Sequence, residues 1–228
     1  SQSGCSRVTT GAPLWSFPDP IPNEDLVSVG ADLTPATLLY AYSHGLFPMR
    51  VFADGPIGWW SPDPRGVLPL ENFRFNRSLR RAQRNFLVTV NTAFEAVMRG
   101  CADPARPHGW IDESFVAAYV RLHQMGFAHS VEVWEQSDSH EPVMVGGVYG
   151  VAVGGLFAGE SMFSRTSNAT KVALAALVTS LRVGGGVLFD VQWRTDHLAS
   201  MGAVEISRSE YLAALTLAVG RPQLTLVN

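Results

Sequence analysis

Residues 142–157 restrict the fold more than any other segment of this chain. They are apolar and rich in β-branched residues, and two pairs interrupt them, Gly146-Gly147 and Gly154-Gly155. This pattern is typical of strands in which glycine permits a turn or a close backbone approach. It predicts two antiparallel strands around a turn near Gly150. Helical patterns lie on both sides of the segment, and this mixture indicates an α+β fold.

Helix signals are clearest where a cap and a stop enclose an apolar pattern. Thr34 can cap a helix that begins at Pro35 and ends near Gly45. Ser207 and Glu210 match a capping box. Further helices are expected at 77–85, 92–101, 113–125 and 168–183 and from Ser207 to Gly220, together with a short helix that Thr195 caps and that ends at Gly202. Strands are expected at 86–90, 129–135 and 187–191.

The length and composition suit one core domain with a small addition. The chain has 228 residues, of which 46% are hydrophobic and 16% charged, a balance that permits a buried core. Residues 13–69 are rich in proline, glycine and tryptophan, and prolines at 62 and 64 force extended backbone. We therefore expect a loop-rich N-terminal domain at 1–64 and a main domain at 65–228.

Other broad features favour a cytoplasmic, non-membrane protein. No apolar run is long enough to span a bilayer, and the first ten residues lack a signal-peptide layout. Cys5 and Cys101 alone make neither a disulfide framework nor a metal site. The net charge is −3, so nucleic-acid binding would need a local basic patch.

Two segments combine carboxyl groups with apolar neighbours. Asp190 and Gln192 follow an apolar strand and are expected to share one face of it. From the residues alone, Asp190 more readily caps a turn or pairs with an arginine than acts chemically. Glu160 stands among Phe157 and Met162, where it could pair with the ammonium group of an apolar ligand or lie solvated at a strand end. These two alternatives are evenly matched.

Arginines and tryptophans offer possible contacts to nucleic acid. Arginines at offsets of three, four and seven form one helical stripe, which suits phosphates or a solvated face paired with acids such as Glu71: Arg77, Arg80, Arg81 and Arg84. Tryptophans near loops can stack on a base, or more often fill the core: Trp59, Trp60 and Trp110. Phosphate-binding Gly loops are absent, and residues 182–187 only approximate an acetyl-CoA loop.

Seven motifs occur together and in one order. They are GADLTP (30–35), GLFP (45–48), WWSPDPR (59–65), AHSVEVW (128–134), GESMFS (159–164), NATK (168–171) and DVQ (190–192). Together they cover roughly residues 17–215, and in this the chain resembles the leucyl/phenylalanyl-tRNA–protein transferase family.

The resemblance implies a fold, a reaction and its partners. The fold would be related to the GNAT acyl-CoA N-acyltransferases, behind a small N-terminal domain. The donors would be leucyl-, phenylalanyl- and, less well, methionyl-tRNA. The acceptors would be proteins with N-terminal arginine or lysine, which are thereby marked for N-degron proteolysis. Neither a metal nor CoA would be used, and we expect a monomer.

The resemblance also assigns residues. Asp190 and Gln192 match the catalytic pair, and Glu160 matches the group near the donor's α-amine. The aminoacyl pocket would comprise Phe157, Met162, Phe163, Ser164 and Phe189. The adenosine and tRNA contacts would be Trp60, Trp110, Arg77, Arg80, Arg81 and Arg84. Three positions depart from the family pattern: Met49 stands for Trp, Val148 for Met and Phe189 for Ile.

The implied chemistry is aminolysis of an aminoacyl ester. Asp190 would orient the attacking amine or accept its proton, directly or through Gln192, unless the ribose hydroxyl assists instead. A peptidoglycan-type aminoacyltransferase is the main alternative, although the sequence has no heptad run for its coiled-coil arm. An acyl-CoA acetyltransferase and a non-catalytic tRNA-binding module are the others.

Overall fold

The chain builds two sheets with helices packed around them. The computed structural model describes residues 15–103, 111–137 and 140–227. A three-stranded sheet has the order β1-β3-β2, and a seven-stranded sheet has the order β10-β4-β9-β8-β7-β6-β5. The strands are β1 Leu26–Val29, β2 Phe47–Arg50, β3 Ile57–Trp60, β4 Arg65–Val67, β5 Phe86–Val90, β6 Ala128–Ser137, β7 His140–Val153, β8 Leu156–Ser164, β9 Leu188–Gln192 and β10 Val204–Ile206.

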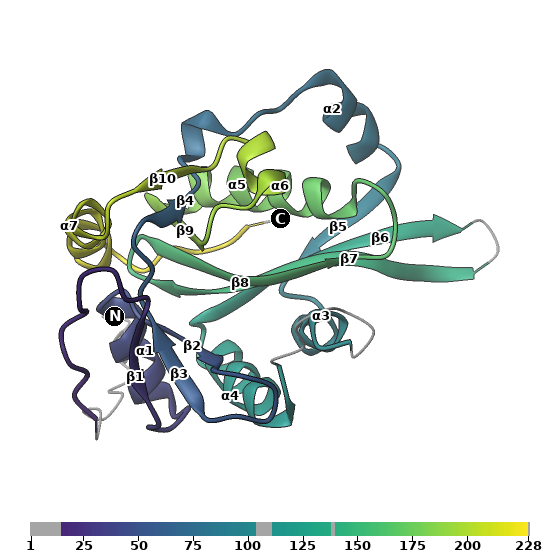
Figure 1. Cartoon of the computed structure of the whole chain (residues 1–228). Coiled ribbons are helices and arrows are strands. Elements are labelled where there is room, and N and C mark those ends of the chain that lie inside the picture. Colours follow the sequence, from purple (N-terminus) through teal and green to yellow (C-terminus); the bar gives the residue numbers. More distant parts are fainter. Residues whose placement is uncertain (1–14, 104–110, 138–139, 228) are drawn as a thin grey trace, which may run out of the picture.

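Helices lie on both faces of the larger sheet (Figure 1). They are α1 Pro35–Ser43, α2 Arg77–Gln83, α3 Phe94–Cys101, α4 Glu113–Gln124, α5 Ala169–Gly184, α6 Asp196–Ser200 and α7 Arg208–Val219, with a short 3-10 helix, η1, at Leu70–Asn72. One core cluster packs α5 and α6 on the sheet, and the other packs α1, α3 and α4 on its opposite face. The predicted mixture of helices and antiparallel strands is confirmed.

One strand pair differs from all the others. The neighbouring strands of both sheets are antiparallel, except that β8 and β9 run parallel. Parallel strands need a crossover, and α5 supplies it. This pair lies in the middle of the larger sheet, where the cavity described below opens.

The predicted helix caps are confirmed. The side chains of Thr34, Thr195 and Ser207 each accept a hydrogen bond from a backbone N–H in the first turn that follows. Ser207 and Glu210 form the complete capping box. Helix α5 starts differently, because Asn168 has a left-handed φ of 71° and its side chain caps no amide.

The predicted turn near Gly150 is wrong. Strand β7 runs unbroken from His140 to Val153, and the turn falls at Gly154-Gly155. A Cβ atom on Gly150 would lie 2.3 Å from the carbonyl oxygen of Ala158 and 2.6 Å from the Phe157 ring. Glycine is therefore needed here for a close approach between β7 and β8, rather than for a change of direction.

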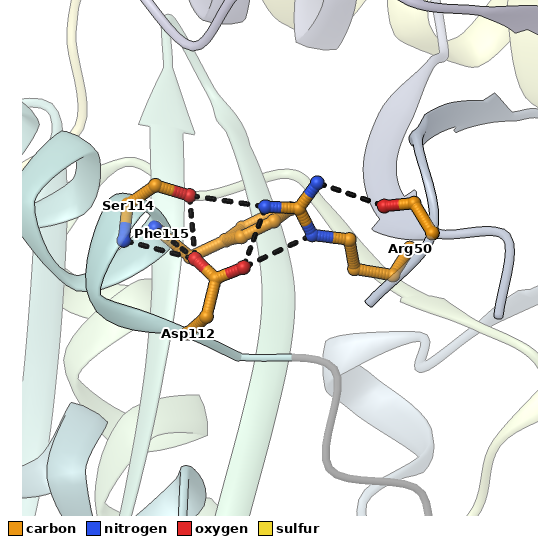
Figure 2. A network of polar contacts seen from close by, with 5 residues as sticks. Arg50, Asp112, Ser114 and Phe115 are labelled. Carbon is orange, nitrogen blue, oxygen red and sulfur yellow. Dashed lines mark hydrogen bonds and ion pairs between the residues drawn. The ribbon is translucent and has the colours of Figure 1, made fainter. Parts of the chain in front are cut away.

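An exposed polar network joins the smaller sheet to α4 (Figure 2). The Arg50 guanidinium donates to the carboxylate of Asp112, to the hydroxyl of Ser114 and to the carbonyl oxygen of Gly55. Asp112 also caps α4 by accepting from the N–H groups of Ser114 and Phe115. One carboxylate thus fixes both the start of a helix and its position beside β2.

No helix within the described ranges combines the length and the apolar character that crossing a bilayer requires.

The close approach at Gly150 generates a stability prediction. Gly150→Ala should lower the free energy of unfolding by about 1–3 kcal/mol, because the added methyl group meets backbone that cannot move away easily. Gly220→Ala is the matched control, since its new Cβ would meet nothing nearer than 3.6 Å. Urea denaturation measures both variants, and equal stability of the two would contradict the assignment.

Candidate active site

A cavity of about 260 Å³ opens where β8 and β9 stop pairing. The two strands pair only from Leu156 and Leu188 to Ala158 and Asp190. The residues that follow in each strand line the cavity, and α5 and α6 contribute Leu174 and Leu198. The lining comprises Val148, Gly159, Glu160, Ser161, Met162, Leu174, Phe189, Val191, Gln192, Trp193, Thr195 and Leu198. It is mainly apolar, with a few polar groups to orient a ligand, as small-molecule sites are.

Glu160 enters the cavity from a β-bulge. Gly159 pairs with Gly150 and Ser161 pairs with Tyr149, so Glu160 is an extra residue without a partner in β7. Bulges redirect side chains and occur often beside active sites. The buried Glu160 carboxyl accepts from the Gln192 amide at 3.1 Å and from the Tyr119 hydroxyl at 3.5 Å. The Tyr119 hydroxyl in turn contacts that of Tyr42.

Burial changes the ionisation of this carboxyl. The pKa of Glu160 is raised from its ordinary 4.5 to about 8. Desolvation is the largest cause and the Asp190 charge adds to it, while hydrogen bonds from the Tyr42 and Tyr119 hydroxyls and the Arg65 charge oppose both. Glu160 is therefore mostly protonated at neutral pH. Burial, together with Glu160, also raises the pKa of both tyrosines well above the usual value.

Asp190 lies behind the cavity in a buried ion pair. The Arg65 guanidinium donates to both carboxylate oxygens, at 2.9 and 2.6 Å, and to the carbonyl oxygen of Gly45. The Tyr211 hydroxyl donates to the same carboxylate at 2.8 Å. Burial is the largest single influence on the pKa of Arg65 and would lower it, but the charge and hydrogen bond of Asp190, with the Tyr211 and Glu160 charges, together outweigh burial, so that this pKa is raised. Asp190 does pair with an arginine, which was the alternative that the residues themselves favoured.

Gln192 departs from the regular alternation of the strand. Its φ is 65°, in the left-handed region, and its backbone N–H donates to Asp190 at 2.8 Å. The side chain lies in the cavity, where its amide group donates to Glu160. Asp190 does not line the cavity, and the two residues predicted as a catalytic pair are linked through the backbone of Gln192.

The structure separates the predicted aminoacyl-pocket residues into two groups. Met162 and Phe189 line the cavity together with Glu160 and Gln192. Phe157 supports Phe189 from the core, with ring centroids 5.6 Å apart. Phe163 points to the opposite side of the sheet and packs against Gly100, because the bulge shifts the alternation along β8. Ser164 is exposed at the strand end and donates to the carbonyl oxygen of Thr166.

The tryptophans occupy different environments. Trp59 is fully buried and donates to the carbonyl oxygen of Gly30, so it fills the core. Trp60 is half-buried and donates to the carbonyl oxygen of Met49. Trp110 lies outside the described residues. Trp193, which was not predicted from the sequence, lines the cavity, is 36% exposed and lies 6.3 Å from the Trp60 ring. Its position directly after Gln192 was the available signal.

The predicted arginine stripe lies on and beside α2. Arg77, Arg80 and Arg81 belong to this helix, and Arg84 is its C-cap residue. All four are exposed, whereas Leu79 is buried against the core. None of the four takes part in an ion pair with another described residue. The helix contacts α5 and β5, and so lies on the α5 side of the sheet.

Comparisons with known proteins agree along most of the chain. The sequence model described as "Leucyl/phenylalanyl-tRNA protein transferase" matches residues 67–216, and that of the family's N-terminal domain matches residues 31–63. The leucyl/phenylalanyl-tRNA–protein transferase of Klebsiella pneumoniae (strain 342) is 48% identical over 86% of this chain and 82% of its own length. That of Pseudoalteromonas atlantica is 44% identical over 92% and 88%.

Among solved structures, one titled "Crystal structure of FemX" has a TM-score of 0.49 and 12% identity, covering 76% of this chain and 66% of that one. This likeness is too weak to define the fold. The two sequence models and the two relatives carry the assignment. The chain therefore belongs, as an enzyme, to the leucyl/phenylalanyl-tRNA protein transferase family.

Proposed function

We propose that this enzyme transfers Leu, Phe and, less readily, Met from aminoacyl-tRNA to the α-amine of proteins with N-terminal arginine or lysine. The product would be a substrate for N-degron proteolysis. The observation that carries the proposal is the cavity between β8 and β9, in which a buried carboxyl and an amide face an apolar lining. Burying a Leu, Phe or Met side chain there contributes about 1.5–3 kcal/mol.

The donor's aminoacyl group occupies this cavity in the proposed complex. Its side chain packs against Val148, Met162 and Phe189, and its α-ammonium pairs with Glu160. The pKa of about 8 fits this role, because an entering cation favours the ionised carboxylate and displaces the proton. Val148 and Phe189 depart from the family pattern and would set the preference between Leu and Phe.

The reaction forms one bond and breaks one. The acceptor nitrogen bonds to the carbonyl carbon, the bond from that carbon to the ribose 3′ oxygen breaks, and the proton lost by the amine ends on the departing oxygen. The Gln192 amide nitrogen donates to Glu160, so its carbonyl oxygen can accept from the attacking amine. Asp190 lies outside the cavity lining, paired with Arg65 and Tyr211, and acts as a positioning residue through the backbone of Gln192.

The remainder of the bound donor tRNA would extend out of the cavity opening and along the surface. Trp193 and Trp60 offer aromatic surface for the terminal adenosine, as Trp110 would. The exposed arginines of α2 would contact the phosphates of the acceptor stem: Arg77, Arg80, Arg81 and Arg84.

The fold relationship, the domain boundaries, the cellular location and the oligomeric state form part of the same proposal. We propose a GNAT-related core at 65–228 behind a small domain at 1–64, supported by the parallel β8–β9 pair in an otherwise antiparallel sheet. A cytoplasmic monomer is proposed as well. The peptidoglycan-type alternative gains no support from the family match.

The direct test measures transfer of labelled Phe from tRNA to two proteins that differ only in the first residue. We expect the protein that starts with Arg to be labelled at least about tenfold faster than the one that starts with Gly, the difference expected for one recognised charged side chain. Labelling of both at one rate, or of neither, would contradict the proposal.

The buried carboxyl makes stability depend on pH. Because folding raises the pKa of Glu160 from 4.5 to about 8, its proton favours the folded chain, fully below 4.5 and progressively less as pH rises towards 8. The unfolding free energy of the wild type, relative to Glu160→Gln, should fall by about 1.4 kcal/mol per pH unit across this window. A pH-independent difference in urea denaturation would refute the raised pKa.

Gln192 and Asp190 should differ in what their replacement changes. Gln192→Asn suits the left-handed backbone but shortens the side chain, and should lower kcat by about 10²-fold or more with the donor KM unchanged. Asp190→Asn leaves the buried Arg65 charge without its ionic partner. It should lower kcat as well, and in addition lower the unfolding free energy by about 3–5 kcal/mol.

Tyr211→Phe is the control for Asp190, because it removes one hydrogen bond to that carboxylate and keeps the ion pair. Steady-state kinetics and urea denaturation measure all three variants. Normal kcat in Gln192→Asn would remove Gln192 from the mechanism.

A further inference from the structure

A second, smaller cavity lies between the first turns of α2 and α5. This α2–α5 groove has a volume of about 160 Å³. It is lined by Arg74, Asn76, Ser78, Leu79, Asn168, Lys171, Ser200 and Met201. The sequence motif NATK at 168–171 supplies two of these residues, and the catalytic cavity uses neither of them.

The groove is cationic, and its two asparagine side chains carry NH2 groups that can donate hydrogen bonds. Arg74 and Lys171 take part in no ion pair with another described residue, and the described lining includes no carboxylate. The pKa of His197 is lowered, mainly by burial and additionally by the nearby positive charge of Lys171. Asn168 lines the groove, and its side-chain NH2 group can donate to a ligand there. Such a lining suits an anion.

The groove borders the catalytic cavity across α5 and α6. Leu174 and Leu198 line the cavity, while Lys171, one turn earlier on α5, and Ser200, at the end of α6, line the groove. Thr170 and His197 hold the two helices together at 3.4 Å. On its other side the groove includes Ser78, from the helix that carries the arginine stripe. The groove therefore lies between the aminoacyl cavity and that stripe.

We infer that the α2–α5 groove binds backbone phosphates of the single-stranded 3′ end of the donor tRNA. The inference rests on the proposed function and adds Arg74 and Lys171 to the donor site. Phosphates complement the two unpaired cations, whereas the proposed acceptor carries a cationic first residue that the same charges would repel. Arg74 also borders a larger cavity, but Glu205 lies there, which makes that route less favourable for phosphate.

The test compares two donors that differ in their phosphates. The double variant Arg74→Gln with Lys171→Gln is assayed with phenylalanyl-tRNA and with 3′-O-phenylalanyl adenosine, which has no phosphate. We expect the KM for the tRNA to rise about tenfold or more at unchanged kcat, with both constants for the adenosine donor unchanged. The slope of log KM against log salt should flatten by about 1.4, or 0.7 for each single-strand phosphate that is no longer neutralised.

Arg121→Gln is the matched control, because this exposed arginine lies on α4, which packs on the opposite face of the sheet. It should leave both donors unaffected. An unchanged KM for phenylalanyl-tRNA in the double variant, or an equal loss of activity with both donors, would overturn the assignment.

A binding measurement separates this inference from the proposed function. A labelled oligonucleotide that ends in CCA is titrated against the wild type and the double variant by fluorescence anisotropy. Weaker binding by the double variant supports the groove even if no transfer occurs, and equal binding overturns it. If the wild type transferred Phe from neither of the two donors, this result would instead refute the proposed function.

Discussion

The buried ion pair between Arg65 and Asp190 holds the two parts of the molecule and the site together. Arg65 begins the strand that follows the N-terminal sheet, and its side chain also binds the carbonyl oxygen of Gly45 at the end of α1. The Phe47 and Tyr211 rings pack against its guanidinium. Two buried charges need such full pairing to offset the loss of water. A remaining lone pair of the carboxylate then accepts from the backbone N–H of Gln192, so one interaction orders both the core and the cavity wall.

Local sequence chemistry predicted the helices of this structure well, but it missed the strands β1, β2 and β3 in a region that was expected to be loop-rich. Caps at Thr34, Thr195 and Ser207 depend on neighbours within four residues, which can be read directly from the sequence. The error at Gly150 had a different origin. Glycine serves a turn and a close backbone approach alike, and only the position of Ala158 across the sheet distinguishes the two.

The site was predictable in its residue types but not in its geometry. Glu160 and Gln192 do share a cavity. No pattern, however, could show that a bulge would turn Glu160 inward, or that Gln192 would adopt a positive φ. Both follow from pairings between strands remote in sequence. Arg65 ends one of the seven motifs, yet its partner is 125 residues away.

The early end of β8–β9 pairing has a thermodynamic consequence. Beyond Ala158 and Asp190 the sheet lacks the contacts that two adjacent strands normally supply to each other. In the proposed complex, the bound aminoacyl group would fill this gap and, for as long as it stays, form part of the hydrophobic core. Occupancy and folding are then linked, and saturation at a hundred times Kd would add about 2.7 kcal/mol to the stability of the chain. The thermal stability of such a protein would then increase with the concentration of aminoacylated tRNA.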